Sequence, residues 1–247
     1  MKQYEAVQRV MEQNGGYATL GHLYENVLDV VGCEWKTKTP FPSIRRIVQV
    51  HPELFFKVRP GLWALAAWRD RLPTEMQPTK KETEAQREFS HSYYQGIIVQ
   101  IGNLQKFETH VPAQDKNRAF LSKGTLGDLV SLQKIYPFSW AHIVDCAKRI
   151  DVVWFNARRM PAALFEVEHS TNMRNSLVKY VELQDFRTKM VIVGDESRSR
   201  QFEQTLSMTA FGPIQGHVRF ISYEQISRYH SNLVEMKVLE SKLNLPH

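Results

Sequence analysis

Two consecutive apolar runs near the middle of the chain carry acidic side chains. The runs span residues 149–155 and 162–168, and residues 156–161 between them form a predicted turn. A strand pair buried on both faces normally excludes carboxylates, because an unpaired buried charge is costly. Asp151 in the first run and Glu166 and Glu168 in the second therefore require a chemical explanation.

Side chains alternate along a strand, so Glu166 and Glu168 are expected on one face, about 6 to 7 Å apart. Two like charges at that distance repel each other unless a cation or a proton lies between them. If Asp151 faces the same side, three hard oxygen ligands converge, which suits Mg²⁺. The alternative is an exposed strand face on which the acids pair with Arg149 or Arg158.

The spacing of these acids resembles the PD-(D/E)xK nuclease superfamily, in its Glu-x-Glu variant. Asp151 is followed by 14 residues and then by Glu166-x-Glu168. The resemblance implies a catalytic set of Asp151, Glu166 and Glu168, with Asp151 and Glu166 holding Mg²⁺ and Mn²⁺ as a substitute. Glu168 stands where the family usually has Lys, so an inactive, binding-only relative remains an alternative.

The same resemblance points to candidates for supporting roles. In many members of the superfamily a Glu or Gln on the first core helix faces the metal, and Glu88 or Gln95 would do so here, although each is also an ordinary helix-surface residue. Lys179 or Lys189 would replace the missing Lys. His169 is expected to point away from Glu168 and to have a structural role. Ser170 and Thr171 are expected to cap the next helix.

Elements around the acidic strands follow the order of a nuclease core, and the resemblance covers about residues 84–225. Periodicity predicts helices over 84–105, 140–147 and 172–186, and strands over 107–111, 189–193 and 218–223. The expected architecture is an α+β or α/β domain with a mixed sheet flanked by helices.

The front of the chain has the pattern of a winged helix-turn-helix. Helices are expected over 4–11, ended by Gly15-Gly16, over 22–30, and over 44–50 with Ser43 as N-cap. Two short apolar runs, 54–58 and 62–66, joined by residues 59–61, predict a β-hairpin. Residues 42–46, 55–58 and 60–65 resemble the HARE-type winged-helix domain, whose relatives have been proposed to sense modified bases.

Basic, amide and hydroxyl side chains in this front part are suited to DNA. They are Ser43, Arg45, Arg46 and Gln49 on or beside the third helix, and Lys57 and Arg59 on the hairpin. Arg45 and Arg46 lie about 100° apart around a helix, so at most one points into a groove. A solvated helix in a protein-interaction domain is the alternative.

Composition sets the remaining limits. The 247 residues are 43% apolar, which excludes a disordered chain, and the net charge of +6 favours polyanionic partners. The chain shows no run of about 18 to 20 apolar residues and no secretory signal at its start, so we expect no membrane span and an intracellular, cytoplasmic protein of prokaryotic type. Cys33 and Cys146 form no metal motif and are expected to be buried.

Together these patterns predict a winged helix-turn-helix domain over residues 1–70, a linker over 71–87 and a nuclease-like catalytic domain over 88–247. The function expected from the resemblance is Mg²⁺-dependent, restriction-type cleavage of double-stranded DNA, with the winged helix reading the target. The HARE resemblance suggests a modified base as one such target, which no residue of the sequence shows by itself. Cutting both strands favours a homodimer. The alternatives are a DNA-binding regulatory protein with an inactive nuclease fold, and a repair nuclease for branched DNA or RNA.

Overall fold

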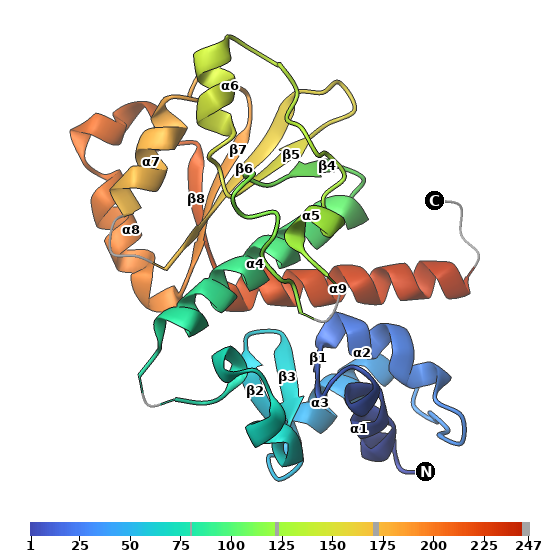
Figure 1. Ribbon diagram of the computed structural model, residues 1–247. Coiled ribbons are helices and arrows are strands. Elements are labelled where there is room, and N and C mark those ends of the chain that lie inside the picture. The colour runs from blue at the N-terminus through green and yellow to red at the C-terminus, as the bar shows by residue number, and fades with distance from the viewer. Residues whose placement is uncertain (80, 122–123, 170–172, 244–247) are drawn as a thin grey trace. The chain divides into compact units, whose positions relative to one another are not determined.

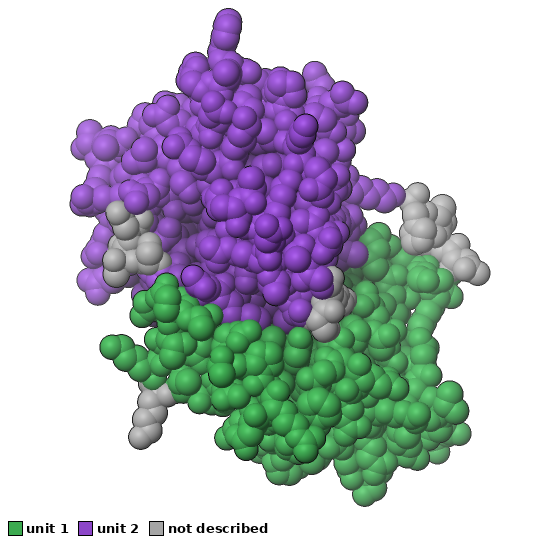
Figure 2. Space-filling view, in the orientation of Figure 1, with its two compact units in different colours: residues 1–87, 227–247 green, residues 88–226 purple. Residues whose placement is uncertain are grey.

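The computed structural model describes residues 1–79, 81–121, 124–169 and 173–243. The chain divides into two compact units, coloured separately in Figure 2. Residues 1–87 and 227–247 form the first unit, and residues 88–226 form the second. Each unit has its own sheet, and the two are described separately.

A mixed five-stranded sheet in the described residues is the centre of the second unit (Figure 1). Its strands are β4 (Glu108–His110), β5 (Val152–Phe155), β6 (Pro161–Glu168), β7 (Lys189–Gly194) and β8 (Val218–Ser222), in that spatial order. The β4–β5 and β5–β6 pairs are antiparallel, and the β6–β7 and β7–β8 pairs are parallel. The predicted mixed sheet is confirmed, and the acid-bearing strand β6 lies at its middle.

One face of this sheet packs against α6 (Ala141–Ala147), α7 (Met173–Val181) and α8 (Ser199–Leu206). Leu164 of β6 belongs to this core together with Leu177 and Tyr180 of α7. Because side chains alternate along a strand, Glu166 and Glu168 share the face of Leu164 and point towards α7. The core thus sets the direction of the two acids.

The long helix α4 (Glu84–Leu104) confirms the helix predicted over 84–105 and approaches the sheet through Gly102. A Cβ atom at Gly102 would lie 2.6 Å from Thr109 of β4 and 2.7 Å from the indole nitrogen of Trp154 of β5. Only a glycine permits this approach. The short helix α5 (Leu126–Leu129) lies in the segment between β4 and α6.

The first unit contains α1 (Gln3–Gln13), β1 (Tyr17–Thr19), α2 (Leu20–Asn26), η1 (Val27–Asp29), α3 (Pro40–Val50), β2 (Phe55–Arg59) and β3 (Leu62–Leu65). The predicted hairpin is present, and β3 also pairs with β1, which the sequence did not predict. Helix α1 ends before Gly15 and Gly16, whose φ angles of +81° and +90° are left-handed values that glycine adopts readily.

Helix α3 begins at Pro40, four residues earlier than predicted, so the prediction of Ser43 as N-cap is wrong. Proline at the first helical position has its φ already fixed for a helix and loses no intrahelical donor. Ser43 lies inside the helix, where its hydroxyl donates to the carbonyl oxygen of Thr39 at 3.1 Å.

Residues 71–79 and 81–87 belong to the first unit and contain regular structure. The 3₁₀-helix η2 (Ala66–Arg71) ends at the first of them, η3 (Thr74–Met76) follows, and the first turn of α4 comes last, with Leu72 and Met76 buried. The side chain of Gln86 closes the segment, because its amide donates to the carbonyl oxygen of Gln77 at 2.7 Å and accepts from Thr79 at 2.7 Å.

The chain ends in α9 (Tyr223–Lys242), which the sequence analysis did not predict. From Ser227 onwards this helix clusters with the first unit, although the sequence-based boundaries assigned all of it to the second domain. The Ser227 hydroxyl donates to the carbonyl oxygen of Pro60 at 2.8 Å, and the guanidinium of Arg45 donates to the side chain of Asn232 at 3.3 Å. Local sequence patterns do not show that residues from Ser227 onwards belong to the first unit.

The two cysteines and the expected lack of a membrane span are the remaining points. Cys146 is buried as expected, whereas Cys33 is only half-buried, so that expectation is wrong for Cys33. Within the described ranges, none of the helices combines the length and the apolar character that a membrane crossing requires.

Candidate active site

Glu166 and Glu168 are buried side by side at the end of β6, with exposed fractions of 3% and 7%. The hydroxyl of Ser176 on α7 lies 3.1 Å from Oε2 of Glu166 and 2.7 Å from Oε1 of Glu168. Contact with one hydroxyl places both carboxylates on the same face of the strand, as predicted. The alternative of an exposed acidic strand face is wrong, because both side chains are buried.

Lys179 is the cation that α7 presents to these acids. Its ammonium lies 2.8 and 2.9 Å from the two carboxylate oxygens of Glu166, and it donates to the carbonyl oxygen of Arg149 at 3.0 Å. Ser176 and Lys179 are three residues apart and therefore lie on one face of the helix. Lys189, the other candidate for the missing family lysine, is exposed at the start of β7.

Ionisation of the buried Glu166 carboxyl has a free-energy cost. Burial raises its pKa well above the usual value, and the nearby charge of Asp151 raises that pKa further. The ammonium of Lys179 and the hydroxyl of Ser176 act in the opposite direction. An additional cation beside Asp151 and Glu166 would relieve the same repulsion.

Asp151 lies just before β5 and connects the acidic strand with α4. Its Oδ2 accepts from the backbone N–H of Val167 at 2.8 Å, and its Oδ1 lies 3.6 Å from Nε2 of His91. Its backbone carbonyl oxygen accepts from the amide of Gln95 at 3.2 Å. These contacts fix both the carboxylate and the backbone of this residue.

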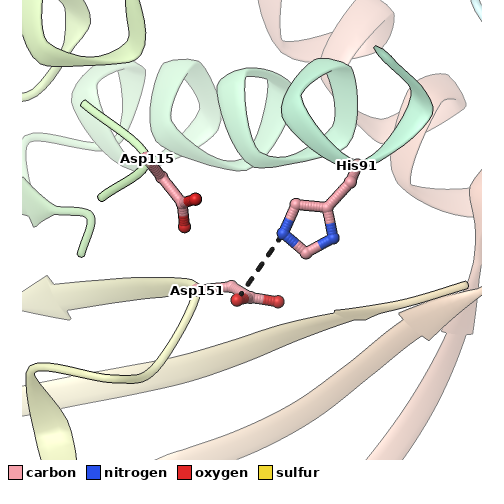
Figure 3. A group of neighbouring side chains, drawn as sticks. All are labelled: His91, Asp115 and Asp151. Atoms are coloured by element: carbon pink, nitrogen blue, oxygen red, sulfur yellow. Dashed lines mark ion pairs between the residues drawn. The ribbon is translucent and has the colours of Figure 1, made fainter. Parts of the chain in front are cut away.

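His91 of α4 faces Asp115 and Asp151 (Figure 3), and Gln95, one turn further along the helix, contacts the same two residues. The Gln95 amide donates to Oδ2 of Asp115 at 3.0 Å, and the other oxygen of Asp115 pairs with Arg118 at 2.8 Å. Potential ligand atoms of His91, Asp115 and Asp151 all lie within 4.8 Å of one another.

This group of three is the set of potential metal ligands found in the described part of the chain. It includes Asp151 of the three predicted catalytic acids but neither Glu166 nor Glu168. The expectation that Asp151, Glu166 and Glu168 meet around one ion stays a prediction.

Of the two accessory candidates, Gln95 lies in this cluster, whereas Glu88 is exposed. The sequence analysis missed His91 and Asp115. A signal existed for His91, because it lies four residues before Gln95 on a helix with many apolar residues. Asp115 lies in a polar loop, where its sequence context does not set it apart.

His169 contacts the hydroxyl of Tyr223 through its ring nitrogens at 2.9 and 3.1 Å, and its ring centre is 6.0 Å from that of His91. Tyr223 also donates to the carbonyl oxygen of Glu168 at 3.1 Å. Ser170 and Thr171, expected as helix caps, lie outside the described residues.

In the first unit, the two arginines of α3 have different surroundings. Arg45 is half-buried and donates to the hydroxyl of Tyr24 at 3.1 Å as well as to Asn232. Arg46 and Gln49 are exposed on the same helix. The expectation that at most one of the two arginines is free for a groove agrees with this arrangement.

On the hairpin, Lys57 is exposed, while Arg59 pairs with Glu82 at 3.1 Å and donates to the carbonyl oxygen of Gln86 at 3.5 Å. Both residues line a pocket of about 250 Å³. Phe56 and Met76 contribute its apolar side.

The second unit thus combines a mixed sheet, two buried acids at the end of its central strand and a lysine from the following helix. Residues 71–243 match the family model described as the Type II restriction enzyme NmeDI C-terminal domain, and the chain belongs to this family. It is 25% identical over 178 residues to the Type II restriction enzyme NmeDI of Neisseria meningitidis serogroup C, a match that covers 67% of this chain.

That match covers 49% of the relative, so the chain corresponds to about half the length of the curated protein it matches. No solved structure shows a significant match to this chain.

Proposed function

We propose that this chain is a Mg²⁺-dependent, restriction-type endodeoxyribonuclease that hydrolyses phosphodiester bonds in duplex DNA. The observation that carries the proposal is the buried pair of Glu166 and Glu168 on β6, with the ammonium of Lys179 2.8 Å from Glu166. Buried acids beside a lysine are costly to keep for stability alone, and such perturbed groups gather at catalytic sites. Membership of a family described by a Type II restriction enzyme supports the same assignment.

Asp151 and Glu166 are the proposed ligands of Mg²⁺, with Mn²⁺ as a substitute. Carboxylate oxygens are the donors that Mg²⁺ prefers, and the charge of Asp151 already raises the pKa of Glu166. When bound, the ion would polarise the scissile phosphate and lower the pKa of a coordinated water.

Lys179 takes the role of the lysine that the family motif places at position 168. Its ammonium favours the ionised form of Glu166 and is a donor for a phosphate oxygen or the attacking water. Glu168 accepts a proton from that water, and the Ser176 hydroxyl orients its carboxylate.

The first unit is the proposed DNA reader, with a winged-helix arrangement of α1, α2, α3 and the β2–β3 hairpin. Arg46, Gln49 and Lys57 are exposed, and we assign the DNA contacts to them. Ser43, Arg45 and Arg59 are only half-exposed and take supporting roles. Cutting both strands would require two copies of the catalytic unit, so the proposed active form on duplex DNA is a homodimer.

Plasmid digestion tests the proposal directly. The purified chain is incubated with methylated and unmethylated plasmid in Mg²⁺, with and without EDTA, beside the variant Glu166→Gln. Cleavage that needs the metal and is lost in Glu166→Gln is the expected result, and the two plasmids together test whether a modified base is read. Binding without cleavage in any condition would favour the regulatory alternative, and cleavage confined to RNA or branched DNA would favour the repair nuclease.

A further inference from the structure

His91, Asp115 and Asp151 bring together an imidazole and two carboxylates from three separate parts of the second unit. They come from α4, from the loop after β4 and from the residue just before β5, and their side chains point towards one another (Figure 3). All three ligand atoms lie within 4.8 Å of one another. Ligands of a six-coordinate ion at about 2.1 Å are spaced roughly 3 to 4 Å apart, so small side-chain rotations would close the set.

Gln95 supplies an independent sign of a ligand at this place. The residue has an exposed fraction of 0%, and its amide nitrogen touches both Asp115 and Asp151. Its amide oxygen is buried and has no hydrogen-bond partner in the described structure. A buried amide oxygen without a partner is uncommon, and the one here belongs to an amide that contacts two residues of the group. A half-turn of this amide would exchange its nitrogen and oxygen, so that the oxygen would face Asp115 and Asp151, where a cation would satisfy it.

Charge compensation also differs among the acids. Asp115 pairs with Arg118, and Glu166 pairs with Lys179. For Asp151, the ion pair within the described residues is with His91, an imidazole rather than a lysine or arginine. A divalent ion beside Asp151 would therefore compensate the carboxylate that has the weakest cationic partner of these three.

We propose that His91 Nε2, the carboxylates of Asp115 and Asp151, and the amide oxygen of Gln95 form a site for a first-row divalent transition metal ion. A mixed nitrogen and oxygen donor set favours such an ion over Mg²⁺. This ion position differs from the Mg²⁺ position proposed at Asp151 and Glu166, although Asp151 is a ligand of both. It rests on the proposed function only through that shared residue.

Mn²⁺ is the probe, because its binding and its ligands are both visible by electron paramagnetic resonance. Titration of the full chain in a Glu166→Gln background, which weakens the other proposed Mn²⁺ position, gives the affinity from the free-ion signal, and pulsed spectra of the bound ion show whether a nitrogen is coordinated. We expect a nitrogen signal that disappears in His91→Asn, and a loss of Mn²⁺ affinity of about tenfold or more in His91→Asn and Asp115→Asn. The matched control His217→Asn, at an exposed histidine of the same unit, should behave like the wild type.

A second variant, Gln95→Glu, distinguishes an ion site from a purely structural role of the cluster. Replacing a neutral amide oxygen with a carboxylate adds a charged ligand, so Mn²⁺ should bind more tightly and raise the melting temperature more than in the wild type. Without an ion site, a third carboxylate would only destabilise the cluster. Unchanged Mn²⁺ affinity in His91→Asn and Asp115→Asn, a nitrogen signal that persists in His91→Asn, or no tighter binding in Gln95→Glu would each overturn the proposal.

Failure of this site and failure of the nuclease assignment are distinguishable. Glu166→Gln should abolish plasmid cleavage and leave the nitrogen signal of bound Mn²⁺ intact. A chain that shows this signal but cuts no nucleic acid would keep the metal site and lose the proposed function. A chain that cuts plasmid with Mg²⁺ but shows no nitrogen signal would keep the proposed function and lose the metal site.

Discussion

The ammonium of Lys179 on α7 lies 2.8 Å from Oε2 of Glu166 on β6, thirteen residues earlier in the chain. The lysine comes from the helix that follows the acidic strand, whereas the family motif would place it on the strand itself, where Glu168 stands. Since Glu166 is buried beside Asp151, the ammonium favours the ionised form of this carboxylate. Lys179 and Glu166 therefore act as one unit in the proposed chemistry.

Lys179→Met should reduce the plasmid cleavage rate by about 10²- to 10⁴-fold, because groups that assist proton transfer contribute factors of that size. It should also raise the pKa of Glu166 further, so the remaining cleavage should move to higher pH. Single-turnover cleavage rates measured across pH provide the test. Lys189→Met, at an exposed lysine, is the matched control. Equal losses in the two variants would contradict the assignment.

His110 on β4 should make the second unit sensitive to acid. Burial, with smaller contributions from the charges of Lys116 and Lys148, lowers its pKa from 6.5 to about 4. Between these values the unfolded chain binds more protons than the folded one, so the free energy of unfolding should fall as pH decreases from 6.5 to about 4. Urea unfolding at several pH values should show a weaker dependence in His110→Phe. The exposed His217→Phe serves as control, and an unchanged slope in His110→Phe would refute the prediction.

Arg46 and Arg45 should separate DNA binding from stability. Arg46→Ala should weaken DNA binding, because one exposed cation is lost. The slope of the logarithm of the binding constant against the logarithm of the salt concentration should become less steep by about one. Arg45→Ala should mainly lower the melting temperature, since Arg45 contacts Tyr24 and Asn232. Fluorescence anisotropy at several salt concentrations, together with thermal unfolding, distinguishes the two effects. The reverse pattern would show that Arg45 is the DNA contact.

Gly96→Ala should destabilise the second unit. A Cβ atom at Gly96 would lie 2.1 Å from the ring of Phe120, and overpacking of this kind costs about 1 to 3 kcal/mol. Gly212→Ala is the matched control, because nothing lies within 4 Å of a Cβ at that position. Denaturant unfolding measures both changes. A stability of Gly96→Ala equal to that of the control would mean that Phe120 can move aside.

Local patterns predicted much of the architecture. The apolar runs predicted β5 and β6 with their acids, because a carboxylate within an apolar run is unfavourable to bury and can be recognised from the sequence alone. Alternation correctly placed Glu166 and Glu168 on one face, and periodicity predicted α4 and the β2–β3 hairpin. The start of α3 was missed because Pro40 at the first helical position was interpreted as part of a turn.

The sequence by itself determined most of the strands and helices, and that Glu166 and Glu168 share a face. Only the tertiary structure decided that Lys179 supplies the cation, that His91 and Asp115 join Asp151, and that residues from Ser227 onwards return to the first unit. The physical reason is range. Periodicity acts between neighbours along the chain, whereas these contacts join side chains separated by 13 to 187 residues, and close only when the sheet and helices pack.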